Sequence, residues 1–303
     1  MSHPAPPRSA LALAALAAVL FSAKAILAKL LYRHGLDAVT VLALRMLFSL
    51  PVFAAVAVLE TARARERGTR LSARQVWLIV LLGLLGYYLS SFLDFLGLQY
   101  IGAALERLIL FLNPTLVLLF GVAFLGQRVA PRDWLAMGVS YAGVVLVFVE
   151  GLRLGGPDVV LGAGLVLGAA IAYAVYLLLS ARLVASVGSL RLVAYAMCVS
   201  SAAGLLQFAA LKPLTALVLP WEVYGLSALN ALFCTVVPVY LTMFAVARIG
   251  AGATAQTSML GPVSLLFLGH WVLGEPITLL QLAGTAVVLA GVWLLSRKPV
   301  PTA

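Results

Sequence analysis

The chain has 303 residues, of which 64% are hydrophobic and only 10% are charged, and its mean hydropathy is +1.12. A soluble protein of this length carries about 25% charged residues, so the composition excludes a soluble globular domain and predicts an all-α integral membrane protein with several spans. The formal net charge of +10 does not indicate a nucleic-acid partner, because the basic residues stand in short segments between apolar runs.

Apolar windows of about 20 residues, ended by glycine, proline and charged residues, predict ten transmembrane helices. The first window resembles the apolar region of a signal peptide, but it continues past Lys24 to Leu31, so we expect it to be retained. The expected spans in chain order are 9–31, 39–59, 76–98, 103–125, 133–150, 159–180, 192–211, 223–247, 251–273 and 279–296.

Lysine and arginine are distributed unevenly over the connecting segments. With the amino terminus inside, the inner segments hold 13 basic residues and the outer loops hold three, Arg33, Arg153 and Lys212. Basic residues favour the cytoplasmic side, so both termini are predicted to be cytoplasmic in a bacterial inner membrane. The sequence is compatible with a monomer and leaves a dimer open.

The chain contains an internal repeat. Shifted by 148 positions without a gap, residues 101–149 align with 249–297, and 14 of the 49 positions are identical. Each half contains five expected spans, an odd number, so corresponding helices must point in opposite directions. We therefore predict two inverted five-helix repeats, 1–150 and 151–303, an arrangement typical of alternating-access transporters.

Both halves carry a helix breaker at aligned positions, Asn113-Pro114 and Gly261-Pro262. Pro114, Gly261 and Pro262 are the predicted helix-breaking residues, because a proline removes one backbone bond and crowds the carbonyl four residues earlier. We expect the freed carbonyls, those of Leu110 and Ser258, to face a watered cavity on the transport path. Gly164-x-x-x-Gly168 predicts close helix packing.

Two further segments carry a family resemblance. The stretches "NPTLVLLFGVAFLGQRVAPRDW" and "GPVSLLFLGHWVLGEPITLLQ" resemble the paired proline-containing helices and LGE-type turns of the EamA-type exporters in the drug/metabolite transporter superfamily. The resemblance implies efflux of small metabolites through a central cavity, without ATP or another cofactor. The second copy has Glu275 where the first has Gln127, and a glutamine there is similar to aromatic amino-acid exporters of the YddG type.

Polar and aromatic side chains near mid-depth are the candidates for substrate contact. The third, fourth, sixth, eighth and ninth spans are expected to line the cavity, and a tyrosine hydroxyl or an amide at that depth needs a partner. Polar and aromatic side chains at this depth are explained equally well by helix packing, with tyrosine hydroxyls bonded to the backbone. The candidates are Tyr87, Ser91, Asn113, Tyr173, Tyr240 and Gln256.

Ionisable side chains inside the spans form a second candidate set, because such groups are costly in lipid and usually face partners or water. One alternative is an ion-paired cluster that holds helices together. The other is a binding site in which a base attracts a carboxylate and an acid attracts an amino group or carries a proton. A histidine in the ninth span could couple transport to protons or simply pack. The set is Lys24, Arg45, Asp94, Glu106 and His270.

The function expected from these patterns is export of small amphipathic metabolites, aromatic or neutral amino acids in particular. Drugs, nucleosides and sugars are alternative substrates. A lipid-modifying membrane enzyme is the alternative from another class, and it requires Asp94, Glu106 and His270 to converge on one site. The sequence contains no GxxxxGK[ST] or HExxH motif, so we expect no metal or cofactor. The expected partners are the small-molecule substrate and the lipid bilayer.

Overall fold

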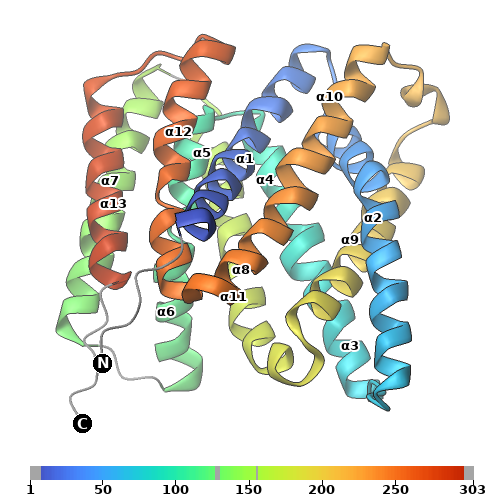
Figure 1. Cartoon of the computed structure of the whole chain (residues 1–303). Helices are drawn as coiled ribbons and strands as arrows, with labels where there is room; N and C mark the ends of the chain where they lie inside the picture. Colours follow the sequence, from blue (N-terminus) through green and yellow to red (C-terminus); the bar gives the residue numbers. More distant parts are fainter. Residues whose placement is uncertain (1–7, 127–129, 155, 297–303) are drawn as a thin grey trace.

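The computed structural model describes residues 8–126, 130–154 and 156–296, apart from a few side chains within helices. These residues form helices and connecting turns, with no strand among them (Figure 1). Eight helices are long and apolar enough to cross a membrane, and two shorter apolar helices, Leu260–Leu273 and Leu279–Leu294, follow them. The fold is therefore all-α, with ten membrane segments in two inverted halves. Gln127 lies outside the described residues.

The first half contains two continuous spans, two interrupted ones and a final continuous one. Its third span has a π-helical segment in the middle, and its fourth is broken by a two-residue turn. The elements are α1 (Arg8–Arg33), α2 (Ala38–Glu66), α3 (Ala73–Leu82), η1 (Gly83–Leu89), α4 (Ser90–Leu98), α5 (Ala103–Leu110), α6 (Asn113–Leu125) and α7 (Pro131–Leu154).

The second half repeats this pattern, with a π segment in its third span. Shifted by 148 positions, η1 falls on 231–237, which contains the π segment Leu232–Val236. The elements are α8 (Val159–Val187), α9 (Ser189–Leu211), η2 (Leu214–Leu217), α10 (Trp221–Ala231), η3 (Leu232–Val236), α11 (Val237–Thr257), α12 (Leu260–Leu268), η4 (Gly269–Leu273) and α13 (Leu279–Ser296).

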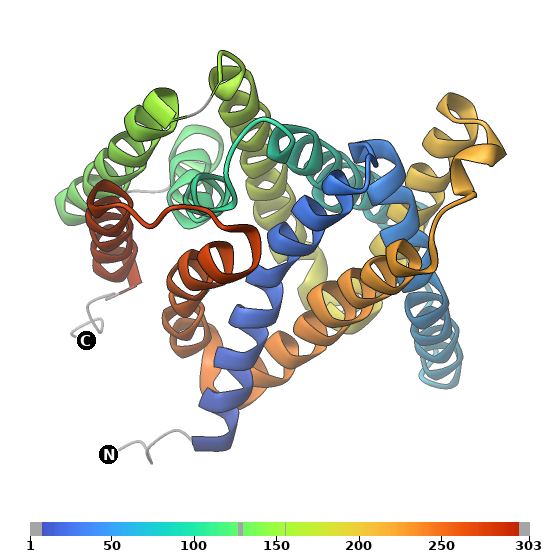
Figure 2. The same cartoon turned by 90° about the horizontal axis from the view of Figure 1, so that it is seen from above.

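The two halves pack against each other through equivalent pairs of helices. Helix α1 packs on α11, and its counterpart α8 packs on α4. Figure 2 shows α7 and α13 together on one side, α2 and α9 on the other, and α1, α11 and α12 between them. The upper end in Figure 1 is where α1 ends and α2 begins, and the lower end is where α2 ends and α3 begins.

The aligned Leu-Gly pairs of the two repeats end helices in the same way. Gly126 follows α6 with φ 63°, and Gly274 follows η4 with φ 74°. This left-handed conformation is accessible to glycine without steric penalty and is a common helix C-cap. The sequence repeat therefore corresponds to a structural repeat.

One predicted boundary is wrong. We expected the eighth span to end at 247 and the ninth to begin at 251, but α11 continues to Thr257 and the turn lies at residues 258–259. Arg248, expected in a loop, lies within α11, with its guanidinium 4.8 Å from the centroid of the Phe244 ring. This contact one turn apart accommodates a single charge inside the helix.

Glycines let two helix pairs approach closely. A Cβ added to Gly97 of α4 would lie 2.6 Å from the carbonyl oxygen of Gly162 in α8. A Cβ on Gly143 of α7 would lie 2.7 Å from the carbonyl oxygen of Gly284 in α13. The packing expected at Gly164 is not observed, since a Cβ there would meet nothing within 4 Å.

Replacing Gly284 with leucine should therefore destabilise the fold. A Cβ there would meet the Val147 side chain at 2.4 Å, and overpacking of this kind lowers the free energy of unfolding by about 1–3 kcal/mol. Thermal unfolding of the purified protein checks this. Gly164→Leu is the matched control and should unfold at the wild-type temperature. Equal unfolding temperatures for both variants would contradict the close packing.

An ion pair at the upper end joins the α1–α2 turn to the residue that follows α9. Asp37 accepts a hydrogen bond from the Thr40 backbone N–H (2.9 Å), which caps α2, and it also pairs with Lys212. Burial raises the pKa of Asp37, but the hydrogen bonds from Lys212 and Thr40 outweigh it and hold the pKa below its ordinary value of 3.8.

A folded-state pKa below the unfolded one makes a stabilising contribution that is present above pH 3.8 and lost as the pH falls through the lowered value. In Lys212→Gln the hydrogen bond that lowers the Asp37 pKa is gone. We therefore expect acidification to lower the unfolding temperature of this variant less than that of the wild type. Unfolding temperatures measured between pH 7 and pH 3 test it. Parallel pH profiles for the variant and the wild type would show that the pair contributes nothing.

Candidate functional site

A buried cluster of opposite charges lies where α1 crosses α4 and α5. The Lys24 ammonium donates a hydrogen bond to Asp94 Oδ2 and lies 3.6 Å from Glu106 Oε1. The three residues are 6%, 2% and 0% exposed, respectively. Such charges are tolerated in a protein interior only when paired, so Lys24 ties α1 to both helices.

Arg45 extends this cluster toward the second half of the chain. Its Nε donates to Thr235 Oγ1 of η3 (2.8 Å) and its guanidinium also donates to Ser91 Oγ of α4 (3.2 Å). The Phe95 ring lies between the two cations, 5.7 Å from Lys24 Nζ and 5.3 Å from the Arg45 guanidinium carbon. These distances are typical of cation–π contacts.

Several polar atoms of the cluster have no hydrogen-bond partner among the described residues. They are Asp94 Oδ1, both carboxylate oxygens of Glu106, and Arg107 Nε. Arg107 belongs to α5, packs over the Phe21 ring and lies beside Gly261 at the start of α12. Buried polar atoms are nearly always bonded, so these free acceptors and this free donor are candidates for ligand contact.

The paired helix breaks satisfy their own backbone. Helix α5 ends at Leu110 and α6 begins at Asn113, so Pro114 occupies the first turn of α6, where its missing N–H is not needed. The Leu110 carbonyl, expected to face water, instead accepts a bond from Asn113 Nδ2 (2.6 Å).

At the second break, the turn lies at residues 258–259 and Gly261 and Pro262 fall in the first turn of α12. The Ser258 carbonyl accepts from the Gly261 backbone N–H (2.9 Å). The expectation of open carbonyls at the breaks is therefore wrong. At the first break, Asn113 Oδ1 is buried without a hydrogen-bond partner among the described residues.

The candidate tyrosines divide into two groups. Tyr87 of η1 hydrogen-bonds Tyr176 of α8 (hydroxyl oxygens 3.0 Å apart), and the Tyr173 ring stacks on Tyr176 with centroids 5.4 Å apart. Tyr240 of α11 instead stacks on Phe53 of α2 at 6.2 Å, and its hydroxyl is buried without a partner in the described part of the chain. Gln256 lies in α11, and its side chain is outside the described residues.

His270 does not join the charge cluster. Its side chain is exposed in η4, and its Nδ1 lies 3.0 Å from the carbonyl oxygen of Glu275. Glu275 itself accepts a bond from the Ala103 backbone N–H at the start of α5 (3.2 Å) and thereby joins the two halves at the upper end. The convergence of Asp94, Glu106 and His270 that an enzyme requires is absent.

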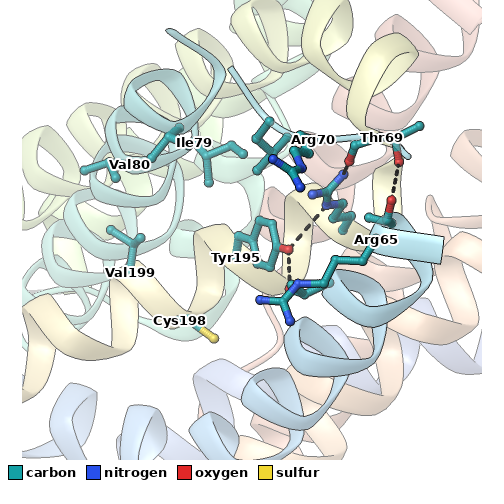
Figure 3. Close-up of a pocket in the computed structure, with 13 residues that line it drawn as sticks. Arg65, Thr69, Arg70, Ile79, Val80, Tyr195, Cys198 and Val199 are labelled. Carbon is teal, nitrogen blue, oxygen red and sulfur yellow. Dashed lines mark hydrogen bonds between the residues drawn. The ribbon is translucent and has the colours of Figure 1, made fainter. Parts of the chain in front are cut away.

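Two cavities stand out among the described residues, and neither of these two is lined by any of the six predicted contact residues. One, of about 900 Å³, lies at the lower end among α2, α3 and α9 (Figure 3). The other, of about 330 Å³, lies at the upper end beside Lys29, Tyr32 and Glu275. We expected a cavity among the third, fourth, sixth, eighth and ninth spans, whereas the 900 Å³ cavity borders the second, third and seventh.

Sequence reasoning missed several participants. Thr235 accepts a hydrogen bond from Arg45 and was not among the candidates. Asn230 of α10 is fully buried, and both atoms of its amide lack a partner among the described residues. A single threonine or asparagine in an apolar run carries no periodic signal, although an unpaired amide at mid-span is itself unusual in lipid.

Comparisons with known proteins agree with this architecture. Residues 8–149 and 160–297 each match the model of the EamA-like transporter family. The chain belongs to the EamA-like transporter family. Two matched segments in one chain correspond to the two inverted halves of this EamA-like protein.

The relatives of this chain include two transporters that align with most of its length. "Uncharacterized transporter YcbK" of Bacillus subtilis is 32% identical over 281 residues, which cover 88% of this chain and 86% of that protein. "Probable terminal-alkyne amino-acid exporter" of Streptantibioticus cattleyicolor is 29% identical over 238 residues, 75% of each chain. The family and these relatives are transporters, so this EamA-like chain is a multi-pass membrane transporter and not a lipid-modifying enzyme.

A solved structure described only as "Crystal structure of protein" shares the fold. It superposes with a TM-score of 0.65 at 20% sequence identity and covers 95% of this chain and 96% of its own. This similarity shows a shared arrangement of the helices.

Removing Lys24 should destabilise the protein more than removing an exposed partner. Lys24→Met leaves two buried carboxylates without their cation, a change that lowers the free energy of unfolding by about 3–5 kcal/mol. The double variant Lys24→Met/Asp94→Asn should lose less free energy of unfolding than Lys24→Met, because one of the unpaired charges is gone. Denaturant or thermal unfolding measures both.

Arg63→Gln is the control, since Arg63 pairs with Glu60 (2.7 Å) on an exposed face of α2. Exposed pairs contribute at most about 1 kcal/mol. If Lys24→Met were as mild as Arg63→Gln, the buried pair would not hold α1 in place.

Proposed function

We propose that the chain exports small zwitterionic metabolites, aromatic or neutral amino acids in particular, by alternating access. The observation that carries this proposal is the buried cluster of both charge signs with unpartnered carboxylate oxygens on Asp94 and Glu106. A zwitterion brings one ammonium and one carboxylate, and the cluster offers a partner for each.

The chemistry of recognition follows from the geometry. The substrate ammonium would take the place of Lys24 at the Asp94 and Glu106 carboxylates, each of which retains a free acceptor. The substrate carboxylate would pair with Arg107, whose Nε is free, or with the released Lys24. Charge-assisted hydrogen bonds in a dry site are strong and directional, which suits selection of a small solute.

The apolar part of the substrate would lie against aromatic side chains. Phe95 is already in contact with the cations of the cluster, and Phe21 lies against Arg107. Flat aromatic walls beside a few fixed polar groups favour a substrate with a hydrophobic side chain. The Streptantibioticus relative, described as a probable terminal-alkyne amino-acid exporter, supports the same class.

Alternation would come from halves 1–150 and 151–303 rocking against each other. At the upper end they meet through the Ala103 N–H to Glu275 bond, and at the lower end through the Gln75 Nε2 to Ser186 Oγ bond (3.2 Å). Breaking the contacts at one end while keeping those at the other would expose the charge cluster to one side of the membrane at a time. We propose that the lower end, with its arginine-rich 61–74 segment, faces the cytoplasm.

Counterflow in proteoliposomes tests the proposal. Labelled phenylalanine or leucine should accumulate in vesicles loaded with the same unlabelled amino acid. Glu106→Gln should lower the initial rate about tenfold or more, because a hydrogen bond to a charged group is worth about 1.5–3 kcal/mol. N-acetylated and carboxamide derivatives, which lack one charge, should compete poorly.

Glu150→Gln is the matched control, since Glu150 is also buried within a span but lies on α7, outside the cluster. It should transport at the wild-type rate. Counterflow of a labelled nucleoside or sugar, with none of a labelled amino acid, would overturn the substrate class. An unchanged rate in Glu106→Gln would remove the cluster from the site.

A further inference from the structure

The 900 Å³ cavity at the lower end is lined by three arginines and by no acidic residue. Arg65 lies at the end of α2, Arg70 in the α2–α3 turn and Arg191 in the first turn of α9. Of the ion pairs formed by the described residues, none involves Arg65 or Arg70. Their charges are therefore free to meet an anion at the mouth of the cavity.

Arg191 has a different role in this cavity. It is buried, and its guanidinium donates to the Thr69 carbonyl (3.2 Å) and to the Tyr195 hydroxyl (3.3 Å). Tyr195 in turn bonds Thr61 of α2 (2.5 Å). These bonds hold the α2–α3 turn against α9, so the mouth is built on a fixed frame.

The opposite part of the cavity is apolar. Figure 3 shows Arg65, Thr69 and Arg70 on one side of Tyr195, and Ile79, Val80 and Val199 on the other. At 1.5 Å per residue, Val199 lies about 12 Å along α9 from Arg191, whose guanidinium bonds the α2–α3 turn. A small anion bound at the mouth would leave the apolar part unused.

The depth of the cavity matches a membrane boundary. Trp77, in the first part of α3, is 74% exposed, and exposed tryptophans typically mark the interface between lipid and water. Arg65 and Arg70 precede Trp77 in the chain, which is consistent with a position on the water side of this boundary, while Ile79 and Val80 follow it within the apolar helix α3. A phosphate and an acyl chain have this same polar-to-apolar order.

We propose that the cavity among α2, α3 and α9 binds one anionic phospholipid, with its phosphate at Arg65 and Arg70 and an acyl chain along Ile79, Val80 and Val199. This site is separate from the charge cluster and goes beyond the proposed export. A bound lipid here would bridge the α2–α3 hairpin of the first half and α9 of the second.

The test uses the purified full chain with phosphatidylglycerol, phosphatidylcholine or glycerol phosphate as probe. Native mass spectrometry counts retained lipid, and alkylation of Cys198 reports on the cavity itself. Cys198 lines the cavity and is half-buried, whereas Cys234, the other cysteine, is buried in η3. Phosphatidylglycerol should be retained and should slow Cys198 alkylation several-fold, and the other two probes should not.

The variants isolate the two arginines. Arg65→Gln/Arg70→Gln should lower phosphatidylglycerol retention about tenfold or more, since each basic residue near a membrane surface contributes measurably to anionic-lipid binding. Arg67→Gln/Arg74→Gln removes the same charge from the same 61–74 segment but from residues that do not line the cavity, and it should behave as wild type. Val80→Trp fills the apolar part with the arginines intact and should also abolish protection of Cys198.

Three results would overturn the proposal. Equal losses in the two double variants would indicate general surface attraction. Protection by glycerol phosphate equal to that by phosphatidylglycerol would indicate a small-anion site. Full protection in Val80→Trp would show that no acyl chain enters the cavity. Transport counterflow is a separate measurement, so failure here leaves the proposed function to its own test.

Discussion

The pairing of Lys24 with Asp94 and Glu106 is the constraint on which the arrangement of the first half depends. An ammonium and two carboxylates buried within the spans cannot be left apart, because an unpaired buried charge destabilises the fold by several kcal/mol. The pairing therefore fixes how α1 crosses α4 and α5. Arg45 then connects the same cluster to η3 of the second half, through Thr235.

The same interaction explains how a stable protein can hold a binding site. Lys24 pairs with both carboxylates yet leaves Asp94 Oδ1 and the Glu106 oxygens without a hydrogen bond, and the neighbouring Arg107 keeps a free donor beside Gly261. The cluster thus has buried ion pairs that stabilise it and unpaired polar atoms that could bind the zwitterion proposed as substrate. If the proposed substrate binds these atoms, the same atoms fix the helix crossing, and occupancy of the site would be coupled to the relative position of the halves.

Much of the architecture could be predicted from sequence, because membrane spans and repeats leave long-range periodic signals. The 148-residue shift correctly aligned Gly126 with Gly274, and it also aligns the two π segments. The loop predicted at residues 248–250 is absent, and Arg248 lies inside α11 with its guanidinium over the Phe244 ring one turn away.

The ionisable candidates could be named from their rarity in lipid, but their pairing depends on contacts such as the one between residues 24 and 94, which lie 70 positions apart. Asn113 donates to the carbonyl three residues before it, a local pattern that sequence alone could have indicated. The lower cavity depends on side-chain packing among three helices and leaves no periodic signal.

The most direct test of zwitterion recognition by the cluster is an experimental structure with a neutral amino acid bound. The ligand ammonium should lie about 3 Å from a carboxylate oxygen of Asp94 or Glu106, with Lys24 displaced from Asp94. The ligand carboxylate should face Arg107 or Lys24. An amino acid bound elsewhere, with Lys24 still paired to Asp94 and no ligand atom near Glu106, would contradict it.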